Sequence, residues 1–338
     1  GLMDEKGALI RSCGLGTISR LLKEDSDNTD SLLVRAIAKS IEQGVGRCHC
    51  VSYQSDTLEL SGQFLKNTVT SPPPASKNLT GYLGEVVAHF SRFGLSAIGG
   101  YIPAQEGYPE SLFIYANLDG TLGGPPALYV TGIAFGFGLN YELIPPNLKD
   151  LGTYPLIPVP TSTTPKANGP SDIGPALDSL NGTVIQEQPG ENWIAAGIQV
   201  TSYNMITGFA LVSVSFGLET YIGILGSVSM TLPKGNPEPL GFVEIDATVN
   251  FNPSSGLLPI LGVVSPSSYF LDGVITLTGG FAFYIWYGGA NKGDFVFTIG
   301  GYYPGFTVPS NYPKVAPLSI NFDMGPFKAN GSAYLALT

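Results

Sequence analysis

Hydrophobic residues alternate with polar or small residues through most of the chain beyond residue 80. In the stretch FALVSVSF, Val212 and Val214 are separated by Ser213 and followed by Ser215. A period of two is that of a β-strand, whose successive side chains point to opposite faces of a sheet. The pattern predicts strands at residues 82–101, 112–117, 127–141, 193–201, 207–217, 220–232, 241–251, 273–287, 294–301, 318–323 and 332–338.

One segment near the N-terminus has a helical period instead. Residues 31–43 read SLLVRAIAKSIEQ, in which Leu33, Ile37 and Ile41 recur at helical spacing and Gly44 follows as a C-terminal stop. Charged residues are also concentrated in this part of the chain. The sequence therefore predicts a short α-containing N-terminal segment.

Proline-rich stretches divide the chain into parts. Residues 1–67 form the charged, helix-containing segment, and residues 68–80 (TVTSPPPASKNLT) are predicted to be a Pro/Ser/Thr linker. Residues 81–338 are predicted to form a β-rich domain with a long Pro-rich loop at 144–171. The predicted fold class is mainly β, a large antiparallel multi-strand sheet or sandwich assembly.

Composition supports strands and argues against a nucleic-acid partner. Charged residues make up 12% of the chain, against about a quarter in a typical domain, and there are 44 glycines and 27 prolines. The net charge of −10, without a cluster of Lys or Arg, would repel a phosphate backbone. Residues 192–218 carry no charge, but polar residues alternate within them, so a membrane is an unlikely partner. A membrane-inserted barrel or toxin component is the least favoured alternative.

Motifs for catalysis are missing from the sequence. Gly123 and Gly124 lead into Pro125 and Pro126, which have no N–H to offer a phosphate group. The chain contains neither a nucleophile-elbow motif nor the paired histidines of a zinc protease. We expect no catalytic residue, no cofactor and no metal, and hence a protein that is not an enzyme.

Cysteines and carboxylates leave several interpretations open. Cys48 and Cys50 flank a histidine, but in a strand the thiols and the imidazole point to opposite faces and could not close on one ion. A disulfide from Cys13 to one of them and reduced thiols are the main alternatives. Glu244 and Asp246 share one strand face, which we interpret as an ordinary solvated face.

Three sequons are candidate glycosylation sites, at Asn78, Asn181 and Asn330. The chain begins at Gly1 without a basic and apolar leader, which is compatible with a leader already removed or with a fragment. We expect an extracellular or cell-surface location.

Several long blocks together resemble a known family. They are LFIYANLDGTLGGPPALYVTGIAFGFGLNYELIP, WIAAGIQVTSYNMITGFALVSVSFGLE, LTGGFAFYIWYGG and DFVFTIGGYYPGFTVPSNYPKVAPLSINFD, with GSAYLALT after them. Across residues 80–338 the chain is similar to the domain-of-unknown-function family 6603. That family is widespread in bacteria and also occurs in fungi, so the resemblance favours a bacterial source and implies no activity. Members continue past the last block, so we expect the final strand here to leave a sheet edge.

Two functions from different classes are expected. The first is a non-enzymatic structural subunit that self-assembles into an extracellular filament through sheet edges or donor strands, with residues 7–20 and 332–338 as candidate donors. The alternative is a carbohydrate-binding or carbohydrate-active secreted β domain whose partners are glycans. Its candidate sugar-stacking residues are Tyr284, Trp286, Tyr287, Tyr302 and Tyr303.

Overall fold

The fold is mainly β and antiparallel, as the sequence predicted. The computed structural model describes residues 2–3, 9–10, 48–54, 58–70, 78–90, 93–105, 107–148, 151, 154, 156, 184–203, 205–233 and 239–338. The chain divides into two compact units. Unit 1 comprises residues 1–120, 136–141 and 161–189, and unit 2 comprises residues 121–135, 142–160 and 190–338.

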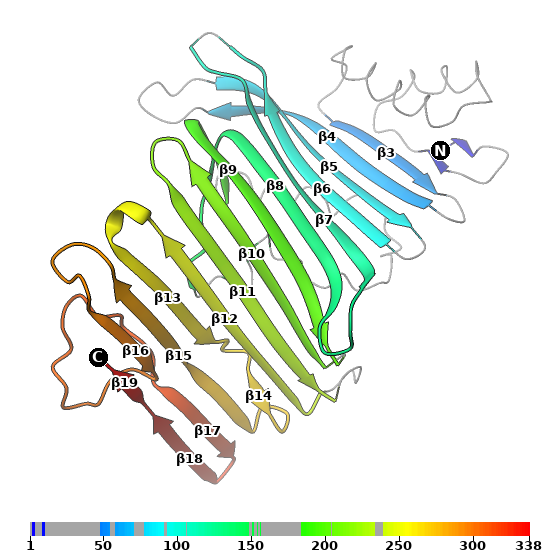
Figure 1. The fold of residues 1–338 in the computed structure, drawn as a ribbon. Coiled ribbons are helices and arrows are strands. Elements are labelled where there is room, and N and C mark those ends of the chain that lie inside the picture. The colour runs from blue at the N-terminus through cyan, green and yellow to red at the C-terminus, as the bar shows by residue number, and fades with distance from the viewer. Residues whose placement is uncertain are drawn as a thin grey trace. The chain divides into compact units, whose positions relative to one another are not determined.

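Unit 1 is built on five antiparallel strands that pair in chain order, side by side in Figure 1. They are β3 (Cys48–Gln54), β4 (Leu58–Thr70), β5 (Asn78–Phe90), β6 (Phe93–Ile102) and β7 (Ser111–Gly123). The short strands β1 (Leu2–Met3) and β2 (Leu9–Ile10) pair with each other.

One face of the unit 1 sheet is well buried. Leu83, Ile102, Phe113 and Tyr115 are each no more than 7% exposed. Gly100 lies between Leu83 and Phe113, and a Cβ there would meet the Phe113 ring at 2.4 Å. The missing side chain therefore lets the ring lie flat on the sheet.

Besides β7, whose last three residues belong to unit 2, two long strands contribute residues to both units. These are β8 (Tyr129–Leu143) and β9 (Ile185–Ser202).

Unit 2 contains the remaining strands. β10 to β13, β15 and β16 follow β9 in an antiparallel ladder, while β14 pairs with β12 and β15. β15 also pairs with β17, β17 with β18, and β16 with β19. The bounds are β10 (Ile206–Phe216), β11 (Tyr221–Leu232), β12 (Gly241–Phe251), β13 (Leu257–Val264), β14 (Tyr269–Phe270), β15 (Ile275–Trp286), β16 (Phe295–Ile299), β17 (Leu318–Met324), β18 (Phe327–Ala333) and β19 (Leu335–Leu337), with the 3-10 helix η2 (Pro253–Ser255) between β12 and β13.

The unit 2 core lies on one face of this ladder. Trp193, Leu211, Ala282 and Val296 are almost fully buried on that face. Tyr154, from the Pro-rich segment, is also buried, and its hydroxyl donates a 2.8 Å hydrogen bond to the carbonyl of Ile144. We call this the covered face of unit 2.

Strand β8 changes its buried side part of the way along. Up to residue 138 the buried positions are even-numbered: Gly132, Ala134, Gly136 and Gly138. Beyond residue 140 they are odd-numbered: Tyr141 and Leu143. Asn140 lies between the two sets with a φ of 56°, and its side chain donates a 2.8 Å hydrogen bond to the carbonyl of Glu110. A residue in this conformation shifts the alternation by one position, as in a β-bulge.

Several expectations differ from the structure in detail. The strand predicted at 82–101 is two paired strands, β5 and β6. Residues 68–70 and 78–80 of the predicted linker lie in the paired strands β4 and β5, and residues 71–77 lie outside the described residues. The predicted helix at 31–43 lies outside the described residues. In the part of the chain that is described, no helix is both long and apolar enough to cross a membrane.

The glycine and proline pairs after residue 122 form the turn between β7 and β8. The N–H of Leu128 donates to the carbonyl of Pro125 at 2.9 Å, which closes the turn. Gly123 and Gly124 have φ values of 129° and 131°, where only glycine is unstrained. A Cβ on Gly124 would lie 2.5 Å from the carbonyl oxygen of Leu128, whereas one on Gly123 would meet nothing within 4 Å.

This turn gives a matched pair of substitutions. Gly123→Ala and Gly124→Ala both place alanine at an unfavourable φ, but only Gly124→Ala adds a backbone collision. We expect Gly124→Ala to lower the free energy of unfolding by about 1–3 kcal/mol more than Gly123→Ala does. Urea unfolding followed by circular dichroism measures the difference. Equal losses would show that the close approach at Gly124 contributes nothing.

Candidate functional site

A group of polar side chains lies on the covered face of unit 2. The Ser227 hydroxyl is 3.4 Å from Oε1 of Glu244 and also hydrogen-bonds to the carboxylate of Asp246. Asp246 is only 4% exposed, and burial raises its pKa above the ordinary range. The Ser268 hydroxyl accepts from the backbone N–H of Glu244 at 3.0 Å. The expected solvated face is therefore wrong for Asp246.

This carboxylate pair lacks the surroundings of a glycosidase. Two catalytic carboxylates must flank a sugar ring in an open cleft. Glu244 and Asp246 come from one strand and share one hydroxyl. Neither of them lines the two hollows of unit 2 described below. We assign the group a role in packing the covered face.

A second polar group is buried in unit 1. The Tyr141 hydroxyl hydrogen-bonds to the carboxylate of Glu187, and these residues are 1% and 5% exposed. Burial raises the pKa of both, and the charge of Glu187 adds to the rise for Tyr141 and for nearby Tyr108. The shift of alternation at Asn140 is what turns Tyr141 inward. Strict alternation along the strand would place Tyr141 on the opposite face, so sequence periodicity alone could not have predicted its contact with Glu187.

Glu85, in the middle of β5, is a third partly buried acid. The strand registers place Ile98 and Tyr115 beside it on the same face of the sheet. Its Oε2 atom is buried and has no hydrogen-bond partner among the described residues. Because burial disfavours the charged form, the pKa of Glu85 is raised to about 7.

The raised pKa of Glu85 makes stability depend on pH. The folded chain holds this proton more tightly than the unfolded chain, so stability falls as pH rises from about 4.5 to 7. We expect this carboxyl to account for a loss of about 2 kcal/mol after allowance for solvent screening. Glu85→Gln should remove that part of the slope in urea unfolding measured at several pH values. Identical slopes in both proteins would contradict the assignment.

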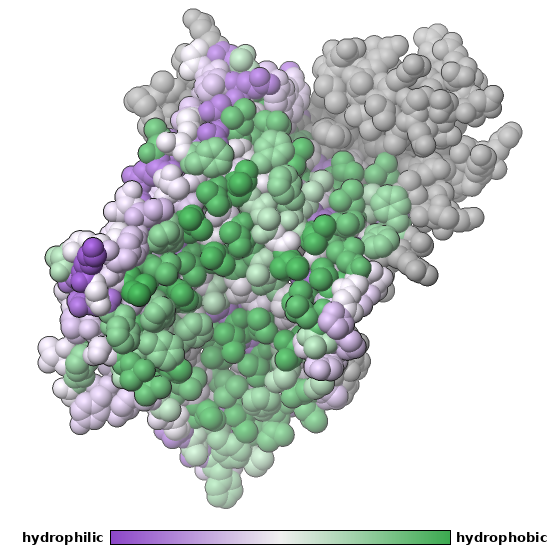
Figure 2. Space-filling model, viewed as in Figure 1, coloured by the Kyte–Doolittle hydropathy of each residue, from purple (hydrophilic) through white to green (hydrophobic). Residues whose placement is uncertain are grey.

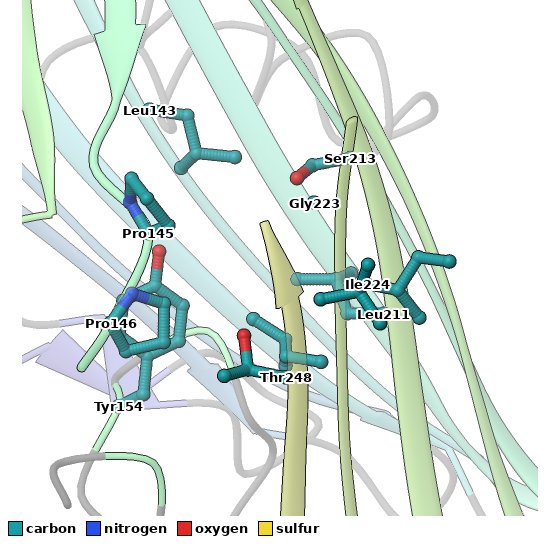
Figure 3. A pocket seen from close by; sticks show the side chains of 11 residues that line it. Leu143, Pro145, Pro146, Tyr154, Leu211, Ser213, Gly223, Ile224 and Thr248 are labelled. Carbon is teal, nitrogen blue, oxygen red and sulfur yellow. The ribbon is translucent and has the colours of Figure 1, made fainter. Parts of the chain in front are cut away.

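Unit 2 has two hollows of different size. In Figure 3, Pro145, Pro146 and Tyr154 face Leu211 and Thr248 across a small cavity. Its volume of 20 Å³ has room for about one water molecule. A larger hollow of 510 Å³ has a mainly apolar lining, in which Lys314 is the charged residue.

Other predicted site residues are scattered. Cys48 and Cys50 lie in β3, while Cys13 and Asn181 are outside the described residues. The described residues contain no group of three His, Cys, Asp or Glu side chains suited to a metal ion. Asn78 begins β5 and Asn330 lies in β18, and both are exposed.

The aromatic residues predicted to stack on sugars mostly pack on each other. Trp286 is 6% exposed and stacks on Tyr312 with ring centroids 6.0 Å apart. The hydroxyls of Tyr287 and Tyr302 donate to backbone carbonyls at 2.7 Å and 3.1 Å. Tyr303 is different because it is 62% exposed.

The most unusual surface is the face of the unit 2 sheet opposite the covered face. Alternate residues of β9 to β13 and β15 form rows that cross the strands. The first row is Val200, Gly208, Val228, Ile245, Val264 and Gly279. The second is Ile198, Ala210, Gly226, Ala247, Gly262 and Phe281. The third is Ala196, Val212, Ile224, Val249, Ile260 and Phe283.

These three rows contain no polar side chain, and we call them the apolar face. Ile198, Val212, Ile224, Val228 and Ile245 are each 40–49% exposed on it. Figure 2 shows hydrophobic residues gathered over these strands. Monomeric soluble proteins rarely expose a contiguous apolar surface of this kind, and such surfaces mark sites of interaction.

Comparison with known proteins gives a family and no function. A family model described as Family of unknown function (DUF6603) matches residues 42–338, so the chain belongs to that family. The match begins earlier than the expected residue 80 and includes β3 and β4. No curated protein and no solved structure matches the chain.

Proposed function

We propose that this family member is a non-enzymatic structural subunit that assembles with copies of itself into an extracellular filament. Neighbouring subunits would join by pairing the edges of their sheets. The observation that supports the proposal most directly is the state of β18. All seven residues of this strand are exposed, and Phe327 at its start is 71% exposed.

β18 has one paired edge and one open edge. It pairs with β17 along its whole length, from Phe327 opposite Met324 to Ala333 opposite Leu318. In Figure 1, β18 lies at the border of the sheet with β17 beside it, and the register described for β18 is the one with β17. The outer edge therefore presents backbone N–H and C=O groups that a strand from another chain can pair with.

If the β18 edge of one subunit pairs with a different strand edge of the next subunit, the subunits form a filament. Contacts between unlike surfaces leave a free copy of each surface at the two ends, so subunits add without limit. Such assembly needs no catalytic side chain, because main-chain hydrogen bonds supply the contact.

The candidate donors from the sequence are revised accordingly. Leu335–Leu337 of the predicted C-terminal donor form β19 and pair with Phe297–Ile299 of the same chain. The N-terminal donor, residues 7–20, lies outside the described residues apart from β2. The edge of β18 is therefore the proposed contact.

Gly331 allows the edge to be blocked without disturbing the fold. A Cβ at this position would meet nothing within 4 Å, so Gly331→Lys is tolerated within the chain. The added ammonium group would have to be desolvated when a second strand pairs alongside. We expect negative-stain electron microscopy to show filaments of the wild-type chain and none of Gly331→Lys.

The matched control adds the same charge elsewhere. Ser254 is exposed in η2, far from β18 in the strand order, and Ser254→Lys should form filaments as the wild type does. Filaments in Gly331→Lys, or none in the wild type, would contradict the proposal.

A carbohydrate-binding surface is the alternative, and one observation favours it. Tyr303 and Tyr334 are 62% and 47% exposed, and their ring centroids are 6.1 Å apart. Exposed tyrosine rings can stack on the apolar faces of sugars.

This alternative has its own test. It predicts glycan-array binding that falls at least tenfold in Tyr303→Ala and is retained in Leu240→Ala, which truncates a residue that is 59% exposed outside the tyrosine pair. An array without hits for the wild type would exclude it.

A further inference from the structure

We infer that the apolar face of unit 2 is an interface with a second copy of this chain, and that two such faces pack directly on each other. The inference adds a second contact to the proposed self-assembly. It does not need the β18 edge, because a face-to-face pair closes on itself, whereas edge pairing continues along a filament.

The two faces of the sheet divide polar and apolar residues in an unusual way. On the covered face, Gln199, Asp246 and Thr298 are at most 9% exposed. On the apolar face, Val228 and Ile245 are 49% and 42% exposed. This strand buries a carboxylate on one face and exposes isoleucine on the other. The exposed apolar face is therefore a surface that packing within one chain leaves uncovered.

The size of the apolar face suits a stable protein interface. Six strands spaced about 4.8 Å apart, over about six residues of 3.4 Å each, give roughly 590 Å² of flat area, to which the relief of the side chains adds. A standard interface buries about 800 Å² on each partner. One further copy of the same face would therefore cover it.

The relief of the face is self-complementary. The second row is low because its positions Ala210, Gly226 and Ala247 have small side chains or none. The third row is high because Val212, Ile224 and Val249 have larger side chains that project further from the sheet. A two-fold axis lying between these rows places the high row of each copy over the low row of the other. Side chains interdigitate in this way where two sheets pack about 10 Å apart.

Gly226 is the central position of the low row. A Cβ there would meet only the carbonyl oxygen of Phe209, at 3.4 Å, so the space above the glycine is open within one chain. At the β13 end the row is closed, because the ring of Phe281 lies over Gly262. The open groove thus spans β10, β11 and β12.

Charge disfavours a membrane as the occupant. The chain carries 26 acidic residues against 16 Lys and Arg, and a net charge of −10 is repelled by anionic lipid. A second copy covers the face without bringing any ionised group into it, because the three rows contain none.

The test uses the full chain with its edge blocked by Gly331→Lys, so that filaments do not obscure smaller species. Sedimentation velocity over a range of concentrations should show a dimer. Adding Gly226→Leu fills the groove and should weaken the dimer at least tenfold. The matched control Ser254→Leu, made in the same edge-blocked chain, puts a leucine at an exposed position outside the face and should leave the dimer contact intact.

A second variant protects the test against misfolding. Val228→Lys places a charge on a side chain that is 49% exposed, and circular dichroism should be unchanged while the dimer is lost. A monomer at all concentrations in the edge-blocked chain, or a dimer unaffected by both substitutions, would overturn the inference. Flotation with neutral phosphatidylcholine vesicles that is lost in Val228→Lys, without dimers, would also overturn it in favour of lipid.

The outcomes separate this inference from the proposed function. Filaments in the wild type together with an edge-blocked monomer would keep edge assembly and remove the face-to-face contact. A dimer of the edge-blocked chain, together with no filaments of the wild type, would keep the face-to-face contact and remove edge assembly.

Discussion

Main-chain pairing between antiparallel strands is the constraint on which the rest of the structure depends. Once β9 to β13 and β15 are in register, every side chain is assigned to one of two faces, with a period of two. A slip of one residue would move Asp246 to the apolar face and Ile245 to the covered face. The position of the apolar face therefore follows from the ladder and not from any single side chain.

Hydroxyl partners explain how a chain with few charges still buries some of them. Asp246 and Glu187 are each held by a hydroxyl, from Ser227 and Tyr141 respectively. Burial raises the pKa of both acids, which lowers the cost of placing a carboxyl inside. Raised pKa values also occur in catalytic sites, but here neither acid lines the two described hollows. We therefore interpret both groups as structural, which agrees with a protein that assembles.

The sequence predicted the strands well where hydrophobic alternation was regular. β10, β11 and β12 were predicted almost to the residue. β13 was missed because LLPILGVV is apolar throughout and has no period. Periodicity also could not show which face is covered, since that depends on segments distant in sequence. In β8, strict alternation would place Asn140 on the face of Gly136 and Gly138, and its positive φ shifts the alternation there.

Self-assembly of the unmodified chain is the central claim, and small-angle X-ray scattering tests it most directly. The edge of β18 and the apolar face are both exposed, and in this proposal further copies cover them. The account predicts that the scattering mass per particle rises with concentration and that the curves become rod-like. A constant mass equal to a single chain at every concentration would contradict it.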